Sequence, residues 1–252
     1  MPKLRKVLFF IVGLLAIAGV FLIVYRFQKR ARLSIVSDIV PVAIDQFAAT
    51  PTAVIEKSAP EETPKEILPT KFLLSVPFQP QAPFADWSEP YENACEEASI
   101  IIAEYYYKNQ TLSKEQMKSE IDSAVAWQIT NWGGHNDLDA TETLKLASDY
   151  FHLSGQVVKN YSADDIKKYI SSGVPVLAPT AGRKLGNPNF RGAGPEYHML
   201  VIIGYDDSQG IFITNDPGTR NGKNYIYKYQ TLLSAISGPN ENMAKEIIAL
   251  AK

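Results

Sequence analysis

The sequence predicts an α+β domain in which helices come first and a mostly antiparallel sheet follows. Between residues 93 and 172, apolar residues recur at helical spacing behind Asn or Ser caps. From residue 174 onward, short β-branched and aromatic runs are separated by Gly, Asn, Asp and Pro. An apolar stretch near the N-terminus adds a single transmembrane helix ahead of this domain.

That stretch, residues 7–25 (VLFFIVGLLAIAGVFLIVY), contains nineteen uncharged positions, about 28 Å of helix and close to a bilayer's hydrocarbon thickness. A cleaved signal peptide is the alternative, but its apolar core spans only about 7 to 15 residues before a small-residue cleavage site. Basic residues flank both ends and leave the orientation open. We therefore predict a membrane anchor with basic flanks at 1–32, in a single-pass membrane protein with an extracytoplasmic domain.

Residues 33–70 contain five prolines, which is typical of an extended linker rather than a packed core. The folded domain is predicted at 71–252. Because seven of the 25 basic residues lie within the first 32 positions, the rest of the chain carries 18 basic against 27 acidic groups. Such an acidic body makes nucleic acid an unsuitable partner.

The domain is expected to begin with a strand at 71–78 and a proline-containing loop at 79–91. Asn93 and Glu96 form an Asn-x-x-Glu pattern ahead of an apolar helix, which predicts Asn93 as N-cap and Glu96 as its capping-box partner. This assignment puts Cys95 at position N2.

The remaining elements follow from caps and periodicity. Helices are predicted at 113–127, 140–150 and 162–172, the last capped by Ser162 and ending at Gly173. Strands are predicted at 174–178, 197–205, 211–214 and 224–229. The glycine-rich segment 180–196 is either the border of a binding cleft or a variable surface loop.

Cys95 is the chain's one cysteine, so it forms no intramolecular disulfide. A lone cysteine is often a small buried hydrophobe. At a helix N-terminus, however, its thiolate is stabilised and becomes a nucleophile when a base lies nearby. The candidate bases are His135, His152 and His198, of which His198 begins an apolar strand.

The turn-forming residues DDSQG join strands 197–205 and 211–214 and predict a hairpin. This pairing brings His198 near Asp216, where the carboxylate could orient the imidazole. Taken singly, His198 could be a buried core histidine and Asp216 a turn-capping residue. Gln79 and Gln81 are candidate oxyanion donors, or solvated loop glutamines.

The motifs VPFQPQ, YHMLVIIGYDD and GIFITNDPGT resemble those of stand-alone papain-like cysteine peptidases related to the bacteriocin-leader (double-glycine) processing peptidases. The resemblance runs across most of residues 72–229. It implies a papain-like fold, with Cys95 as nucleophile, His198 as general base and then acid, and Asp216 as orienting residue. It also implies Gln81 as the oxyanion-hole glutamine, with Gln79 in reserve.

Two features depart from that family's pattern. Ala94 and Glu96 stand where family members usually have glycines, and thirteen residues separate Gln81 from Cys95. Carboxylates at Glu96 and Glu97 would raise the pKa of the thiol. They could face away, or one of them could select basic groups in a substrate. The aromatics of the longer segment could form a groove wall or pack on the core: Phe84, Trp87 and Tyr91.

The predicted function is hydrolysis of peptide or related amide bonds through a Cys-His-Asp triad and a covalent thioester, without a cofactor. The alternative is a non-catalytic surface module that keeps the same fold to bind peptides or cell-wall material. A metal site at His135, Asp137 and Asp139 is disfavoured, because loop aspartates before a helix usually cap it.

Overall fold

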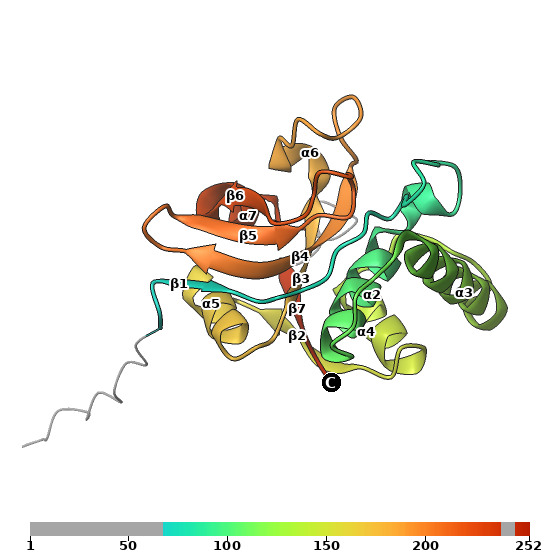
Figure 1. The fold of residues 1–252 in the computed structure, drawn as a ribbon, viewed down its shortest axis with the longest axis horizontal. Coiled ribbons are helices and arrows are strands. Elements are labelled where there is room, and N and C mark those ends of the chain that lie inside the picture. The colour runs from blue at the N-terminus through green and yellow to red at the C-terminus, as the bar shows by residue number, and fades with distance from the viewer. Residues whose placement is uncertain (1–67, 238–244) are drawn as a thin grey trace, which may run out of the picture. The chain divides into compact units, whose positions relative to one another are not determined.

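The computed structural model describes residues 68–237 and 245–252. The predicted anchor at 7–25 and nearly all of the linker at 33–70 lie outside these residues. Within them, no helix is long and apolar enough to cross a membrane. The described chain folds as an α+β domain, with three helices gathered beside one end of an antiparallel sheet (Figure 1).

The first half of the chain supplies those three helices. They are α2 (Cys95–Tyr107), α3 (Lys114–Trp132) and α4 (Ala140–Asp149), and α2 is buried along most of its length. Ser113 caps α3 in a capping box with Gln116, and the helix predicted at 113–127 continues to Trp132. Gly133, at φ 82°, ends it in the left-handed conformation that glycine adopts without strain.

The start of α2 differs from the prediction. Tyr91–Asn93 forms a 3-10 turn, Ala94 is the N-cap, and no side chain caps the helix. Cys95 is therefore at N1 rather than N2. The capping box with Asn93 is wrong because the carboxyl group of Glu96 turns inward, where Leu138 N donates to it at 2.8 Å.

The sheet has seven strands in the order β2-β7-β3-β4-β5-β6, with β1 added on β4, and every pairing is antiparallel. The strands are β1 (Lys71–Leu73), β2 (Ser154–Lys159), β3 (Val176–Ala181), β4 (Tyr197–Asp206), β5 (Ile211–Asn215), β6 (Tyr225–Lys228) and β7 (Glu246–Ala251). The four strands predicted after residue 174 are confirmed. Strand β1 is shorter than the predicted 71–78.

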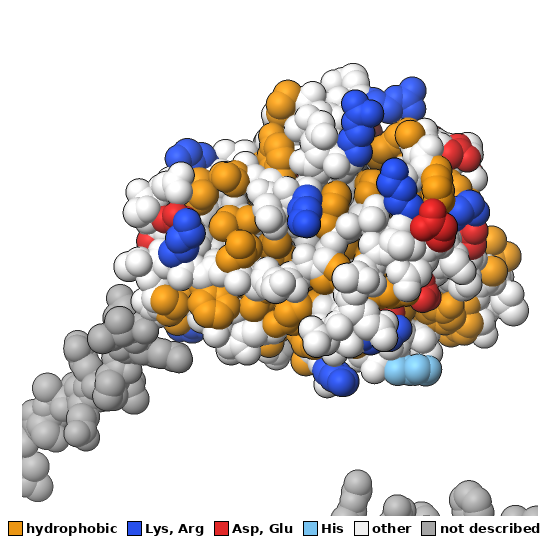
Figure 2. Space-filling view, in the orientation of Figure 1, with side chains coloured by type: hydrophobic (Ala, Val, Ile, Leu, Met, Phe, Trp, Pro, Cys, Tyr) orange, Lys and Arg blue, Asp and Glu red, His pale blue; other side chains and the backbone are white. Residues whose placement is uncertain are grey.

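Three smaller helices complete the described fold: α5 (Ala163–Ser171), α6 (Gly182–Leu185) and α7 (Tyr229–Ala235). Ser162 caps α5 together with Asp165, as predicted. Strand β4 is buried at all ten positions and contacts both α2 and α5, so it forms the centre of the core. On the face in Figure 2, acidic and basic side chains are interspersed and no single basic band forms.

Candidate active site

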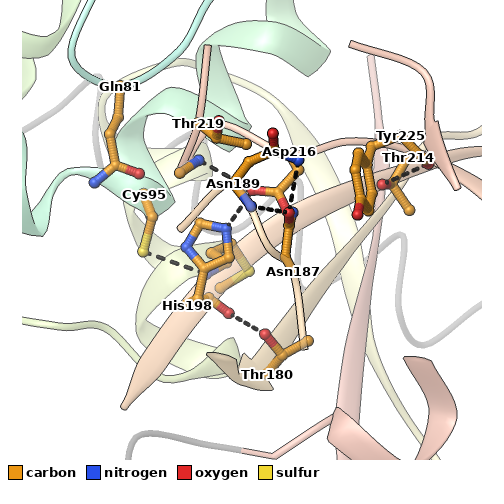
Figure 3. A network of polar contacts seen from close by, with 12 residues as sticks. Gln81, Cys95, Thr180, Asn187, Asn189, His198, Thr214, Asp216, Thr219 and Tyr225 are labelled. Carbon is orange, nitrogen blue, oxygen red and sulfur yellow. Dashed lines mark hydrogen bonds and ion pairs between the residues drawn. The ribbon is translucent and has the colours of Figure 1, made fainter. Parts of the chain in front are cut away.

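The hairpin of β4 and β5 brings His198 and Asp216 together as predicted. His198 lies in β4 and Asp216 follows β5, and their Nε2 and Oδ1 atoms are 2.7 Å apart. Both side chains are buried. The Oγ1 of Thr180 in β3 donates to the backbone carbonyl of His198 at 2.8 Å, which fixes the backbone that carries the ring (Figure 3).

Asp216 accepts hydrogen bonds at both carboxylate oxygens. Oδ1 also accepts from Gly218 N at 3.1 Å, while Oδ2 accepts from Tyr227 Oη at 2.7 Å and from Asn187 Nδ2 at 3.1 Å. Burial alone would raise the pKa of Asp216, but the charge and hydrogen bond of His198, helped by Tyr227, lower it. The carboxylate is therefore held ionised, where it orients the imidazole.

Sequence reasoning missed Asn187 and Tyr227 as partners of Asp216. Asn187 lies in the 180–196 segment and Tyr227 in β6, and the two side chains are also joined at 2.8 Å. The glycine-rich composition of 180–196 was the available signal, because a segment bordering a cleft was one of its two interpretations. No pattern in the sequence singles out Asn187 within that segment.

Two other residues pack closely against the His198 ring. Phe190 meets it edge to face, with ring centroids 5.3 Å apart. Gly218 leaves no room for a side chain, since a Cβ there would lie 2.7 Å from His198 Cε1. The imidazole is thus held by packing as well as by its hydrogen bond to Asp216.

Cys95 is brought to this histidine by the start of α2. Figure 3 shows the thiol beside the His198 ring, with the second ring nitrogen on the side of the sulfur. The backbone N–H of Met199, the residue after His198, donates to Sγ at 3.2 Å. The structure therefore brings together the three residues predicted for the triad.

The Cys95 thiol is also 3.1 Å from Glu96 Oε2. Burial raises the pKa of Cys95, an ionised Glu96 would raise it further through its charge and hydrogen bond, and the Met199 N–H opposes them. The expectation that these carboxylates could face away is wrong for Glu96. The structure gives no support to the hypothesis that one of them selects basic substrate groups, because both are fully buried and Glu97 accepts from Gln128 Nε2 at 2.6 Å.

Gln81 and Gln79 occupy different places. Gln81 lines the cleft beside Cys95, and its Nε2 donates to the carbonyls of Tyr91 and Glu92 at 2.9 and 3.0 Å. Gln79 is held elsewhere, with Nε2 donating to Leu112 O at 3.0 Å. The geometry favours Gln81 over Gln79 as the glutamine near the nucleophile.

Cys95 and His198 open into a cleft of about 380 Å³. Its walls include Trp87 and, from the 180–196 segment, Phe190, Arg191 and Gly194 to Glu196. Of the other two aromatics, Phe84 is 52% exposed and Tyr91 is buried, with its hydroxyl donating to Asp122 at 2.6 Å. Of the two alternatives left open for 180–196, the structure therefore favours the border of a cleft.

The residues considered for a metal site have other partners. Asp139 caps α4 by accepting from Thr141 N and Glu142 N, both at 2.8 Å. His135 Nε2 lies 3.4 Å from Glu97 Oε1. Within residues 68–237 and 245–252, no group of three or more His, Cys, Asp or Glu side chains is arranged to hold a metal ion.

Comparison with known proteins places this geometry in context. The model of the Peptidase_C39 like family matches residues 73–244. A solved C39-like peptidase from Bacillus anthracis is 18% identical, with 72% of this chain and 98% of that chain covered and a TM-score of 0.49. Xylellain, a cysteine protease from Xylella fastidiosa, is 13% identical, with 75% and 90% covered and a TM-score of 0.40. No curated protein sequence matches the chain.

Proposed function

The chain belongs to the Peptidase_C39-like family, which makes it a cysteine peptidase, and we propose that it cleaves peptide bonds with a triad of Cys95, His198 and Asp216. The observation that carries the proposal is the buried His198–Asp216 contact of 2.7 Å beside the chain's one thiol. All three side chains are buried at the base of the cleft or behind it, which suits chemistry sheltered from bulk water.

In this mechanism His198 takes the proton of Cys95, and the thiolate attacks the carbonyl carbon of the substrate. The electron pair of the carbonyl moves to its oxygen. When the tetrahedral intermediate collapses, the leaving amine receives the proton from His198 and a thioester on Cys95 remains. A water molecule, deprotonated by His198, then hydrolyses the thioester. Asp216 holds the ring in the orientation that both proton transfers need.

Two donors are available for the developing oxyanion. As the first helical residue, Cys95 has a backbone N–H without an acceptor inside α2. Gln81 provides the second, by exchanging one of its two carbonyl partners for the substrate oxygen. The backbone N–H of Gln81 donates to Pro217 O at 3.0 Å, so Gln81 is held against the loop after Asp216.

We further propose that residues 7–25 anchor the protein in the membrane and that 33–70 tether an extracytoplasmic peptidase domain. The support is the length and apolarity of 7–25 and the proline-rich composition of 33–70. Fractionation of cells expressing the full chain tests the anchor. Release of the protein by alkaline carbonate washing would contradict it.

The triad is tested with the full-length protein and a library of peptides analysed by mass spectrometry. We expect cleavage by the wild type, a thioester adduct on Cys95 at short times, and loss of cleavage in both Cys95→Ser and His198→Ala. Lys114→Gln, an exposed position at the start of α3, is the control that should keep activity. Peptides that bind without cleavage, with no adduct on Cys95, would instead favour a binding module.

A further inference from the structure

A buried carboxyl group touches the nucleophile and has no role in the triad. Glu96 has no exposed surface. Its Oε1 accepts from Leu138 N at 2.8 Å, and its Oε2 is 3.1 Å from Cys95 Sγ. Each of its oxygens thus has one polar partner, and one of those partners is the reacting sulfur atom.

The groups around Glu96 are mostly acidic. Glu97 is also fully buried, Asp137 lies on the loop before α4, and the buried Tyr197 of β4 donates to Leu138 O at 2.6 Å. The nearby bases are His198, which is paired with Asp216, and His135, which faces Glu97. Within the described residues, no Lys or Arg forms an ion pair with Glu96.

This environment favours the neutral form of the carboxyl group. Burial raises the pKa of Glu96 well above its ordinary value, and the charge of Glu97 raises it further, while hydrogen bonds from the Leu138 N–H and from the Cys95 thiol oppose them. A neutral carboxyl group has an O–H to donate. Since Oε1 already accepts from Leu138 N, the proton belongs on Oε2, whose partner is Cys95 Sγ.

The sulfur atom is likewise placed as an acceptor. Met199 N donates to it at 3.2 Å, from the strand that carries His198. A protonated Glu96 would add a second donor. Two donors directed at one sulfur suit a thiolate, since hydrogen bonds to the charged form of a group favour that form.

We propose that Glu96 is a further catalytic residue, a carboxylic acid that donates a hydrogen bond from Oε2 to the Cys95 thiolate. The inference rests on the proposed function. The proton of the thiol goes to His198, and Glu96 keeps its own proton throughout. When sulfur forms the bond to the carbonyl carbon and loses its charge, the Glu96 hydrogen bond weakens. Glu96 therefore sets how much thiolate is present before attack.

The test compares Glu96→Gln and Glu96→Leu in the full-length protein, using the rate of Cys95 alkylation by iodoacetamide across pH. Glutamine keeps an acceptor for Leu138 N and a neutral donor for the sulfur, so its profile should match the wild type within about half a pH unit. Leucine removes the donor, so the pH profile of alkylation should shift to higher pH by about one pH unit. On the acidic limb of the profile, alkylation should then be roughly tenfold slower.

If Glu96 is ionised instead, the pH profile of Cys95 alkylation should shift in the opposite direction. In that case both variants remove a negative charge beside the sulfur, and both profiles should shift to lower pH by about 1 to 3 units. That result overturns the proposal, and so does a profile unchanged in both variants. If Glu96→Leu fails to fold, infrared spectra decide: the wild type should show a carboxylic-acid C=O band that Glu96→Gln lacks, and absence of this band refutes the proposal.

The same measurement separates this inference from the proposed function. If His198→Ala does not slow alkylation of Cys95, the triad itself fails, whatever the Glu96 variants do. If His198→Ala slows alkylation, and the pH profiles of the Glu96 variants shift to lower pH or not at all, the triad stands and only the role of Glu96 fails.

Discussion

The two walls that meet at the cleft are built differently. On the sheet side, Asp216 accepts four hydrogen bonds and His198 is packed against Phe190. On the helix side, Glu96 and Glu97 are buried side by side without a Lys or Arg partner among the described residues. There, Oε2 of Glu97 and Oε1 of Gln128 are buried without a hydrogen-bond partner in the described part of the chain.

The two walls also shift the pKa values of their carboxyl groups in opposite directions. Although burial opposes it, hydrogen bonds and the His198 charge lower the pKa of Asp216, whereas burial and Glu97 raise that of Glu96. Burial alone therefore does not decide the protonation of a carboxyl group, because the number of donors around it can outweigh desolvation. The sheet side holds His198 in position, and the helix side keeps the Glu96 proton next to the Cys95 sulfur.

The largest expected effect comes from removing the centre of the sheet side. Asp216→Ala leaves His198, Tyr227 and Asn187 without their shared acceptor. We expect the free energy of unfolding in urea to fall by about 3 to 5 kcal/mol, as for a broken buried ion pair. Peptide cleavage should fall at least about a hundredfold.

The helix side provides the matched comparison. Glu97→Ala removes the 2.6 Å acceptor of Gln128 Nε2, which keeps only its 3.5 Å bond to Ala124 O, and the carboxylate that His135 faces; it should cost about 1 to 3 kcal/mol. An equal loss in the two variants would show that the extra hydrogen bonds of Asp216 contribute nothing, and the contrast between the walls would fail. Glu92→Ala, an exposed position on the cleft rim, should leave the unfolding free energy unchanged.

A smaller effect is expected from Gly218→Ala. Its Cβ would lie 2.7 Å from His198 Cε1, so the imidazole or the loop backbone at residue 218 must shift. The rate of peptide cleavage should fall about tenfold to a hundredfold, because a shift of about 1 Å disrupts proton transfer. Gly134→Ala, in the loop on the helix side, meets only Asn136 Nδ2 at 3.3 Å and serves as the control. Normal activity in Gly218→Ala would mean that the ring has room to move.

The smallest effect is the dependence of stability on pH. The pKa of Asp216 in the folded state is below the roughly 3.9 of an unfolded chain, so its stabilisation is complete above about pH 4 and lost as pH falls through the folded pKa. The pKa of Glu96 is above the roughly 4.3 of an unfolded chain. The folded state then holds the extra proton, and stability falls as pH rises from about 4.3 to the folded pKa.

Glu96→Gln should abolish the decline of stability with rising pH that Glu96 causes, and it should leave the acid-side loss that Asp216 causes. In urea unfolding between about pH 3 and about pH 8, the decline of stability above pH 4.3 should flatten by at most about 1.4 kcal/mol per pH unit. The acid-side loss should persist in this variant. A decline of the same steepness in Glu96→Gln and the wild type would mean that the carboxyl group of Glu96 does not retain a proton on folding.

Much of the fold was predictable because its signals are local. Ser113 and Ser162 cap helices in the way that their three-residue spacing to Gln116 and Asp165 indicates. The α+β class, the antiparallel sheet and the peptidase family are confirmed. The turn between β4 and β5 was enough to bring His198 to Asp216, since a hairpin fixes which residues meet.

The rest depends on contacts between distant segments. Strands β2 and β7 lack strong alternation, and each is stabilised by pairing with the other. The pattern of Asn93 and Glu96 fits a capping box, but Leu138 N, more than forty residues later, competes successfully for the carboxyl group. Asn187 reaches Asp216 through a contact between residues 29 positions apart. These outcomes follow from tertiary structure rather than local sequence.

The pairing of distant strands also bears on the order of events during folding. Lys71 in β1 lies opposite Asp206 in β4, and Ser154 in β2 lies opposite Ala251 in β7. Closing loops of this length before any contact is gained slows folding. The sheet that holds His198 therefore finishes forming only after β7 has been synthesised. A nascent chain that has not yet reached residues 246–251 therefore lacks the complete sheet that supports His198.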